Sequence, residues 1–513
     1  MSPSPGQETA EERTARAVDK HVGRASTRLT VAGLVVGTLL VQLAWIISVP
    51  PFRPSDEFDH AYRAASVARG EWAASRRPAV NGRGNLVAVP EELVSAAQSV
   101  CEALPYNGPD NCRPVRSLGG GVVEVASGAS SYNPVFYAPV GAVGRAFDGN
   151  ASLYAMRCAA ALLCALFIGL ACWVTSGWAR THWPFVAMTV GMTPVMVFST
   201  SVLAPNGLEM CAALSLWMSL LGLSTRRGRD MHGTRLILVA AASAAVVVTL
   251  RSLGPLWVGL IVLTCVGVIR MQALATIARR HPMTLGASAL VVAACTVAAA
   301  QWTLANDTNQ VSSSVGLSGG TAVSPISATL REYPLWLLQG IAAFPRRSDP
   351  APALVYILVG AVSLAFLVVG IRTARPRQRA AQVTCVVLAL TVPFAISVVT
   401  IGALGGVWQG RYGLPFHIGV ALLTGLALDS DRFQTRRITS WGVLGVGVVA
   451  FSQVLSILHL LAEETQNRAT TGAGDWLQPP SWLVAALILG GLGAWAWALI
   501  AIVVRGRVRG VAA

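Results

Sequence analysis

Apolar stretches of about 17 to 22 residues recur along the chain, and short segments with charged side chains separate them. A stretch of this length is long enough to cross the hydrocarbon core of a membrane as an α-helix. The pattern therefore predicts an all-α integral membrane protein with about twelve transmembrane helices. The expected helices cover residues 30–49, 152–176, 184–203, 207–223, 235–250, 254–269, 283–304, 351–371, 380–401, 412–428, 438–460 and 481–504.

Two long polar segments interrupt this pattern, at residues 50–151 and 305–350. Each contains an apolar run that is too short to span a membrane, at 132–147 and at 334–344. We interpret both runs as interfacial or re-entrant helices, and the sequence leaves open which of the two they are. A further helix is expected from residue 90 to about residue 104, because a proline followed by two glutamates opens it well.

The composition agrees with a membrane protein and excludes a nucleic-acid partner. Of the 513 residues, 54% are hydrophobic and only 12% are charged. The net charge of +15 comes from basic residues at the ends of apolar runs, which form no continuous basic stripe. Lys20 is the only lysine, and this bias toward arginine is typical of a GC-rich, actinobacterium-like source.

The arginines also orient the protein in the membrane. When the N-terminus is placed inside the cell, every clear arginine cluster falls on the cytoplasmic side, as the positive-inside rule requires. We therefore expect a multi-pass protein of the plasma (inner) membrane with both termini in the cytoplasm. The expected organisation is a disordered tail at 1–29, a single polytopic domain at 30–504 with extracytoplasmic loops at 50–151 and 305–350, and a basic tail at 505–513.

The nine cysteines differ in where they lie. Seven of them fall within apolar runs, where the thiol behaves as a small hydrophobic group. Cys101 and Cys112 lie instead in the first outer loop, where an oxidising compartment favours a disulfide between them. The alternative is that both remain free thiols.

A cluster of ionisable residues directly follows the first apolar run. Ionisable groups beside hydrocarbon are costly, so such a cluster usually serves a function. A carboxylate there can exchange protons with a substrate, which makes Asp56 and Glu57 candidate catalytic acid/base residues. The same cluster offers ligands for a divalent metal such as Mg²⁺ or Mn²⁺. The candidate metal ligands are Asp56, Glu57, Asp59 and His60.

The local pattern predicts a helix that starts at Asp56 with Ser55 as its cap. Spacings of three and four residues then place Asp56, Asp59, His60 and Arg63 on one face of that helix. A purely structural explanation competes with catalysis. In it, the acids complement the helix dipole and pair with neighbouring arginines.

Other polar residues reach the same outer level from distant parts of the chain. Taken singly, each is typical of an interfacial anchor. Together they supply acids that can accept a proton and guanidinium groups that can bind a phosphate. The candidate substrate-binding residues are His60, Asn206, Glu209, Arg251, Gln409, Arg411 and Tyr412.

Three motifs occur in order along the chain: Pro51-x-x-Pro54-x-Asp56-Glu57-x-x-His60, Tyr132-x-Pro134-x-x-Tyr137 and Gln409-Gly410-Arg411-Tyr412-x-x-Pro415. Together they resemble a bacterial membrane-protein family called domain of unknown function 2142, over about residues 30–460. That family is similar in layout to the GT-C membrane glycosyltransferases, which carry an acidic residue and juxtamembrane helices in the first outer loop and use polyprenyl-phosphate sugars as donors.

The resemblance implies a GT-C-like fold, Asp56 or Glu57 as the catalytic acid/base and Arg411 as a contact of the donor phosphate. The chain departs from the family at one position. Asn206 stands where members often have an aspartate near the start of the fourth span, and Glu209 follows one turn later.

The leading hypothesis is the transfer of a sugar from a polyprenyl-phosphate donor to a hydroxyl of an extracytoplasmic glycan, lipid or protein. A secondary transporter or flippase is the main alternative, and a noncatalytic assembly partner is a third. Transporters tend to show paired repeats with site residues near the middle of the membrane, and neither feature is visible here. The sequence leaves open which sugar and acceptor are used, whether a metal is needed, and the oligomeric state.

Overall fold

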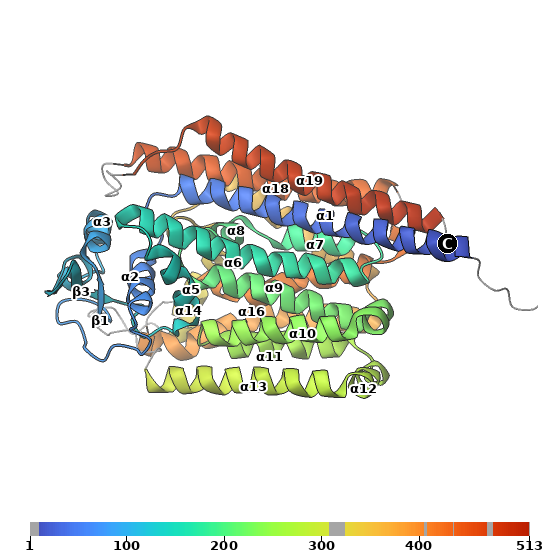
Figure 1. The fold of residues 1–513 in the computed structure, drawn as a ribbon, viewed down its shortest axis with the longest axis horizontal. Coiled ribbons are helices and arrows are strands. Elements are labelled where there is room, and N and C mark those ends of the chain that lie inside the picture. The colour runs from blue at the N-terminus through green and yellow to red at the C-terminus, as the bar shows by residue number, and fades with distance from the viewer. Residues whose placement is uncertain (1–9, 307–323, 405–407, 434–435, 469–475, 512–513) are drawn as a thin grey trace, which may run out of the picture.

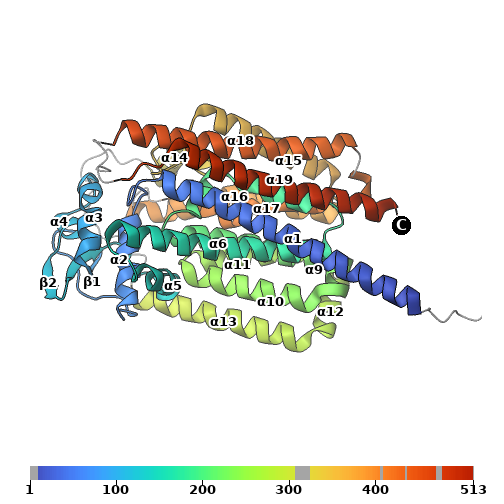
Figure 2. The same cartoon turned by 45° about the horizontal axis from the view of Figure 1, so that its top comes forward.

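The computed structural model is an elongated bundle of helices with a small subdomain at one end (Figures 1 and 2). The long helices run side by side along the bundle, and the first long loop forms the subdomain. The structure describes residues 10–306, 324–404, 408–433, 436–468 and 476–511.

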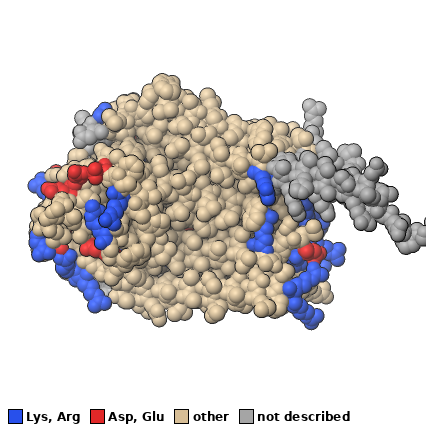
Figure 3. Space-filling model, in the orientation of Figure 1, with Lys and Arg blue, Asp and Glu red and all other residues tan. Residues whose placement is uncertain are grey.

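Ten helices in this part of the chain are long and apolar enough to cross a membrane. Charged side chains gather toward the two ends of the molecule, and a wide uncharged band lies between them (Figure 3). Such a band suits the interior of a bilayer, and the predicted all-α membrane class is confirmed. The ten are α1 (Ala10–Ser48), α6 (Gly149–Trp178), α9 (Pro205–Ser224), α10 (Arg226–Leu250), α13 (Pro282–Ala305), α15 (Ala353–Thr373), α16 (Pro376–Leu404), α17 (Leu414–Leu428), α18 (Arg436–Gln466) and α19 (Ser481–Val511).

The expected count of twelve spans needs correction. The span predicted at 184–203 is two short helices, α7 (Trp183–Gly191) and α8 (Pro194–Ser199). The chain breaks there because Pro194 cannot continue the preceding helix and pushes Thr193 into an extended conformation. A further apolar helix, α11 (Gly254–Val268), is bent by 110° from α12 (Met271–Arg280), so the described residues contain ten or eleven candidate spans.

The subdomain contains a sheet that the sequence analysis did not predict. Its strands are antiparallel in the order β1-β3-β2, with Val87 opposite Val125 and Val89 opposite Val123. These alternating valines bury one face of the sheet, and glycines with positive φ make the turn between β2 and β3. The strands are β1 (Asn85–Pro90), β2 (Arg116–Gly119) and β3 (Val122–Ser127).

Four helices complete the subdomain. One of them matches the helix expected from residue 90, and another is an eleven-residue apolar helix within the run at 132–147. Cys101 and Cys112 are joined by a disulfide, with their Cα atoms 5.4 Å apart. The four helices are α2 (Glu57–Ala68), α3 (Glu91–Glu102), α4 (Pro109–Cys112) and α5 (Pro134–Gly144).

The second long loop contains α14 (Pro325–Gln339), which covers the first part of the short apolar run predicted at 334–344. At the other end of the molecule, the start of α1 and the C-terminal end of the chain lie together, away from the subdomain (Figures 1 and 2). Because α1 begins at Ala10, the structure is helical in most of the segment 1–29, where the sequence predicts a disordered tail.

Candidate active site

Asp56 stands at the junction between the subdomain and the membrane bundle. It is the N-cap residue of α2, with a φ of 61°, a left-handed conformation that aspartate and asparagine tolerate better than most residues. The helix therefore begins at Glu57, one residue later than predicted. The Asp56 side chain is 38% exposed, and its Oδ1 lies 3.5 Å from Nη2 of Arg83. This carboxylate is accessible from outside the protein.

Glu57 points elsewhere and is not available for acid/base chemistry, which corrects its assignment as a catalytic residue. Its two oxygens pair with Nε and Nη2 of Arg157 on α6, at 2.9 and 2.6 Å, and Oε1 also accepts the N–H of Leu203. Both members of the ion pair are at most 1% exposed. Since neighbouring helical residues point about 100° apart, the start of α2 sends Glu57 into the bundle.

The remaining donors of Arg157 bind the end of α1. Its guanidinium donates to the carbonyl oxygens of Ile46, Val49 and Pro50, at 3.1, 2.7 and 2.9 Å. The ion pair thus fastens α1, α2 and α6 to one another, and Glu57 has a structural role.

Asp59 connects α2 to two other segments of the subdomain through hydrogen bonds. Its Oδ1 accepts the N–H of Gly128 at 2.6 Å, and its Oδ2 accepts Nη2 of Arg83 at 2.9 Å. Burial raises the pKa of Asp59 to about 6, although the charge of Arg83 opposes this shift. Arg83 therefore lies between Asp56 and Asp59, and the ionisation of Asp59 helps to hold it there.

His60 is buried beside two tyrosines. Its Nδ1 shares a hydrogen bond of 2.8 Å with the Tyr137 hydroxyl, and its ring is also 5.7 Å from that of Tyr132. Burial lowers the pKa of His60 to about 4; Asp56 opposes the shift, whereas Arg251 and Arg411 add to it. The imidazole is therefore neutral near pH 7. It also lies within electrostatic reach of Arg251 and Arg411, which come from two distant segments.

The structure does not assemble the four predicted metal ligands. Glu57 is engaged by Arg157, Asp59 by Arg83 and Gly128, and His60 by Tyr137. Across the residues that the structure describes, no group of three or more His, Cys, Asp or Glu side chains is arranged to hold a metal ion. The ligand set predicted from the spacing along α2 is therefore wrong, because the side chains of one helix turn have separate partners.

Arg251 follows the end of α10 and connects three predicted site residues. Its Nη1 donates to Oδ1 of Asn206 at 3.0 Å and lies 3.9 Å from Oε2 of Glu209. Its guanidinium carbon is 4.2 Å from the centre of the Tyr412 ring. The start of α9 and the segment before α17 thus both contact the guanidinium of Arg251.

The segment Gln409 to Tyr412 is held tightly against α14. Gly410 opens a 3₁₀ helix, η1 (Gly410–Gly413), and its N–H donates to Oε1 of Gln339 at 3.0 Å. A Cβ atom on Gly410 would overlap the carbonyl oxygen of Trp336, so only glycine allows this close approach. The close packing of Gly410 on α14 fixes the backbone position of the next residue, Arg411.

Arg411 has no acidic partner in the part of the chain that the structure describes. Its Nε is buried without a hydrogen bond, and no ion pair to its side chain occurs among the described residues. An unpaired buried donor on a cation is costly unless a ligand satisfies it. Arg411 is therefore the residue of this site best suited to bind an anion.

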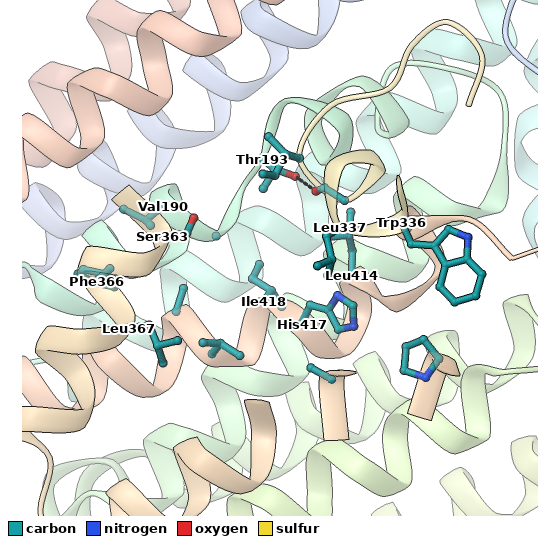
Figure 4. A pocket seen from close by; sticks show the side chains of 18 of the residues that line it. Val190, Thr193, Trp336, Leu337, Ser363, Phe366, Leu367, Leu414, His417 and Ile418 are labelled. Atoms are coloured by element: carbon teal, nitrogen blue, oxygen red, sulfur yellow. Dashed lines mark hydrogen bonds between the residues drawn. The ribbon is translucent and has the colours of Figure 1, made fainter. Parts of the chain in front are cut away.

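An apolar cavity of about 190 Å³ lies within the bundle (Figure 4), and Gly410, the residue before Arg411 in the chain, is part of its wall. Gly410 and Trp408 line it near the site, and Leu414, His417 and Ile418 line it along α17. Side chains of α7, α14, α15 and α16 complete the wall. The position of this cavity suits an apolar chain attached to the group that Arg411 binds.

The model of a protein family described as "Predicted membrane protein (DUF2142)" matches residues 39–420. The chain belongs to this family. The DUF2142 match includes Asp56, Arg251 and Arg411, and it ends within α17, before α18 and α19.

None of the curated proteins matches this DUF2142 chain. Among solved structures, ArnT from Cupriavidus metallidurans in the apo state is similar with a TM-score of 0.44 and 14% identity, covering 90% of this chain and 75% of that one. ArnT bound to undecaprenyl phosphate gives a TM-score of 0.42 and 13% identity, covering 92% of this chain and 77% of that one.

The sequence analysis of this DUF2142 protein missed two residues of the site. Arg83 contacts both aspartates, and Arg157 neutralises Glu57, yet neither belongs to a recognisable motif. An available signal was the position of Arg157 within an apolar run, since a buried arginine in a membrane helix requires a partner. Nothing in the loop sequence singles out Arg83.

Proposed function

We propose that this DUF2142 protein is a membrane glycosyltransferase of the GT-C kind, which moves a sugar from a polyprenyl-phosphate donor to an extracytoplasmic acceptor in the cell envelope. The observation that carries the proposal is the Arg411 guanidinium, whose Nε has no hydrogen bond among the described residues. It follows Gly410 in the wall of an apolar cavity, and it acts on the same His60 imidazole as Asp56. A lipid phosphate has both features, a charged group joined to an apolar chain.

The donor phosphate binds to Arg411, with Arg251 nearby as a second cation. Guanidinium groups suit this role because their planar donors match phosphate oxygens. The first isoprene units of the lipid then enter the cavity along α17, and the rest of the lipid extends into the bilayer. The sugar lies between Arg411 and Asp56.

Asp56 acts as the general base. As its carboxylate accepts the proton of the acceptor hydroxyl, the hydroxyl oxygen forms a bond with the anomeric carbon of the sugar. The bond between that carbon and the phosphate oxygen breaks, and its electron pair leaves with the polyprenyl phosphate. Arg411 and Arg251 stabilise the charge that develops on the departing phosphate. The anomeric configuration is inverted.

The substitution Asp56→Asn tests this assignment. Asparagine keeps the left-handed backbone and the size of the side chain but is not a proton acceptor, so transfer should fall by about 100-fold or more. The assay is release of polyprenyl phosphate from a series of polyprenyl-phosphate sugars by the full chain in lipid vesicles, with cell-envelope extract as acceptor.

Glu91→Gln is the matched control, because Glu91 is an exposed acid of the same subdomain and lies on α3, away from the site. It should retain wild-type transfer. Full activity of the folded Asp56→Asn protein would show that the proposed base is wrong.

A transporter or flippase is the second candidate, and the break between α7 and α8 is the observation that favours it. Broken helices often line the substrate sites of transporters. In this break, however, side chains already bind the backbone: Gln453 donates to the carbonyl of Met192, and Thr193 donates to that of Gly340. Movement of a polyprenyl-phosphate sugar across vesicle membranes without release of polyprenyl phosphate would favour the transporter.

A further inference from the structure

Glu209 is a buried acid whose role the proposed function leaves open. It lies in the second turn of α9 and is only 2% exposed. Its Oε2 is 3.9 Å from Nη1 of Arg251, too far for a hydrogen bond, and its Oε1 has no hydrogen-bond partner among the described residues. The carboxyl group therefore keeps most of its hydrogen-bonding capacity unused.

The geometry around Arg251 explains why Glu209 stays incompletely paired. The same Nη1 atom that faces Glu209 donates its hydrogen bond to Oδ1 of Asn206, and the face of the guanidinium is covered by the Tyr412 ring. Glu209 thus contributes negative charge beside Arg251 without forming a close ion pair with it.

Glu57 provides the contrast within the same protein. It is equally buried, and there the bidentate pair with Arg157 and the N–H of Leu203 satisfy both oxygens. A buried acid that serves only the fold is paired in this way, since a buried polar atom without a partner costs about 1–3 kcal/mol. The vacant oxygen of Glu209 indicates that something outside the chain completes it.

We propose that Glu209 is a specificity residue, which accepts a hydrogen bond from a ring hydroxyl of the sugar carried by the donor. This inference rests on the proposed function. Arg251 and Arg411 both act on the His60 imidazole, so a phosphate held by these arginines brings the attached sugar to the level of Glu209. The donor class is therefore a polyprenyl-phosphate sugar with a free hydroxyl at one defined ring position.

The test compares a polyprenyl-phosphate hexose that the wild-type protein uses with its monodeoxy analogues, each lacking one hydroxyl. A hydrogen bond to a charged group is worth about 1.5–3 kcal/mol, so one analogue should lose about 10- to 100-fold in kcat/KM with the wild-type protein. In Glu209→Ala this difference should disappear, and the parent sugar should fall to the level of that analogue.

Glu209→Gln keeps the size of the side chain and one acceptor oxygen, so it should retain part of the discrimination between the parent sugar and the deoxy analogue. This variant replaces Glu209→Ala in the test if the alanine variant does not fold. Ser215→Ala is the control on the same helix: Ser215 is fully buried with an unpaired hydroxyl that we assign no ligand, and its removal should leave the discrimination unchanged.

Two results would overturn the inference in distinguishable ways. If Glu209→Ala lowers transfer of every analogue by the same factor, Glu209 only positions Arg251, while the proposed function stands. If the wild-type protein neither binds nor transfers any sugar of the series, the proposed function fails and this inference fails with it. Binding of each polyprenyl-phosphate sugar is measured with the Asp56→Asn protein, in which sugar transfer is not expected.

Discussion

Two adjacent acids, Asp56 and Glu57, have opposite surroundings because of one backbone angle. The left-handed conformation of Asp56 delays the start of α2 by one residue, which leaves Asp56 outside the helix and accessible. Glu57 then lies on the face toward the bundle, where Arg157 neutralises it. Both side chains are carboxylates, so their chemical type does not distinguish their roles. The residues around each carboxylate make that distinction.

Glu57→Gln should destabilise the protein by about 3–5 kcal/mol, because it leaves the guanidinium of Arg157 buried without its counter-charge. The measurement is thermal unfolding of the protein in detergent. Asp56→Asn, the neighbouring substitution of the same kind, should shift stability by less than about 0.5 kcal/mol, as expected for an accessible side chain. Equal stability of the two variants would contradict the structural role of Glu57.

The transfer rate should depend on the ionisation of Asp59. Because burial raises the pKa of Asp59 to about 6, its carboxyl is ionised above that pH and protonated below it. Protonation removes the charge that holds Arg83, so activity should fall as the pH drops through about 6. The measurement is a pH profile of transfer, and in Asp59→Asn the acidic limb of this profile, the fall in activity below about pH 6, should be absent.

His60→Gln is the control for that profile. The pKa of His60 is lowered to about 4, so His60 does not change its charge near pH 6 and its removal should leave the limb in place. A limb that persists in Asp59→Asn and vanishes in His60→Gln would reverse the assignment.

At the scale of elements, a short 3₁₀ turn sets the position of Arg411, which we propose to bind the donor phosphate. The turn η1 packs on α14 through Gly410. The Gln339 side chain at the end of α14 accepts the N–H of Gly410 and donates to the carbonyl oxygen of Arg347 in the loop that follows α14. Arg411 therefore depends on the contact between two elements about 70 residues apart in sequence.

Gly410→Ala should displace η1 from α14 and move Arg411. Overpacking of this kind costs about 1–3 kcal/mol, and transfer should fall at least about tenfold because the phosphate contact is lost. Kinetics and unfolding of the variant give both values. Gly360→Ala in α15 is the matched control, since a Cβ there meets open space, and it should leave activity unchanged. An active Gly410→Ala protein would show that the close approach is unnecessary.

At the scale of the whole molecule, the candidate site lies at one end. The subdomain is at the end of the bundle away from the start of α1 and the end of α19 (Figure 1), and Arg251 and Arg411 both act on His60 of that subdomain. A donor lipid reaches this level from the bilayer, and an acceptor reaches it from the aqueous side. We propose that this aqueous side is extracytoplasmic, because the arginine clusters of the short loops favour a cytoplasmic location for the other end.

Cysteine labelling of intact cells tests that orientation. A Ser117→Cys variant, exposed on β2, should react with a membrane-impermeant maleimide in intact cells. An Ala278→Cys variant, exposed on α12 near the other end, should react only after the membrane is permeabilised. The opposite pattern would place the site inside the cell and remove the proposed acceptors.

The sequence by itself determined the class of fold and most members of the site. Long apolar runs must be helices in a membrane because the backbone has no other way to satisfy its hydrogen bonds there, so most spans could be located directly. The break at Pro194 and the sheet were missed, since a proline within an apolar run and short strands within a polar loop give weak local signals. Motifs identified Asp56 and Arg411, and its place at the end of an apolar run identified Arg251, because ionisable groups near hydrocarbon are rare.

Only the tertiary structure decided what each of these groups does. Whether a carboxylate is accessible, paired or left with a vacant oxygen depends on residues far away in the chain: Leu203 is 146 positions from Glu57, and Arg251 is 42 positions from Glu209. No local pattern encodes such distances, because burial and pairing arise only when the helices pack. The sequence therefore supplied the chemical groups, and packing separated the acid that stabilises the fold from the acid positioned to react.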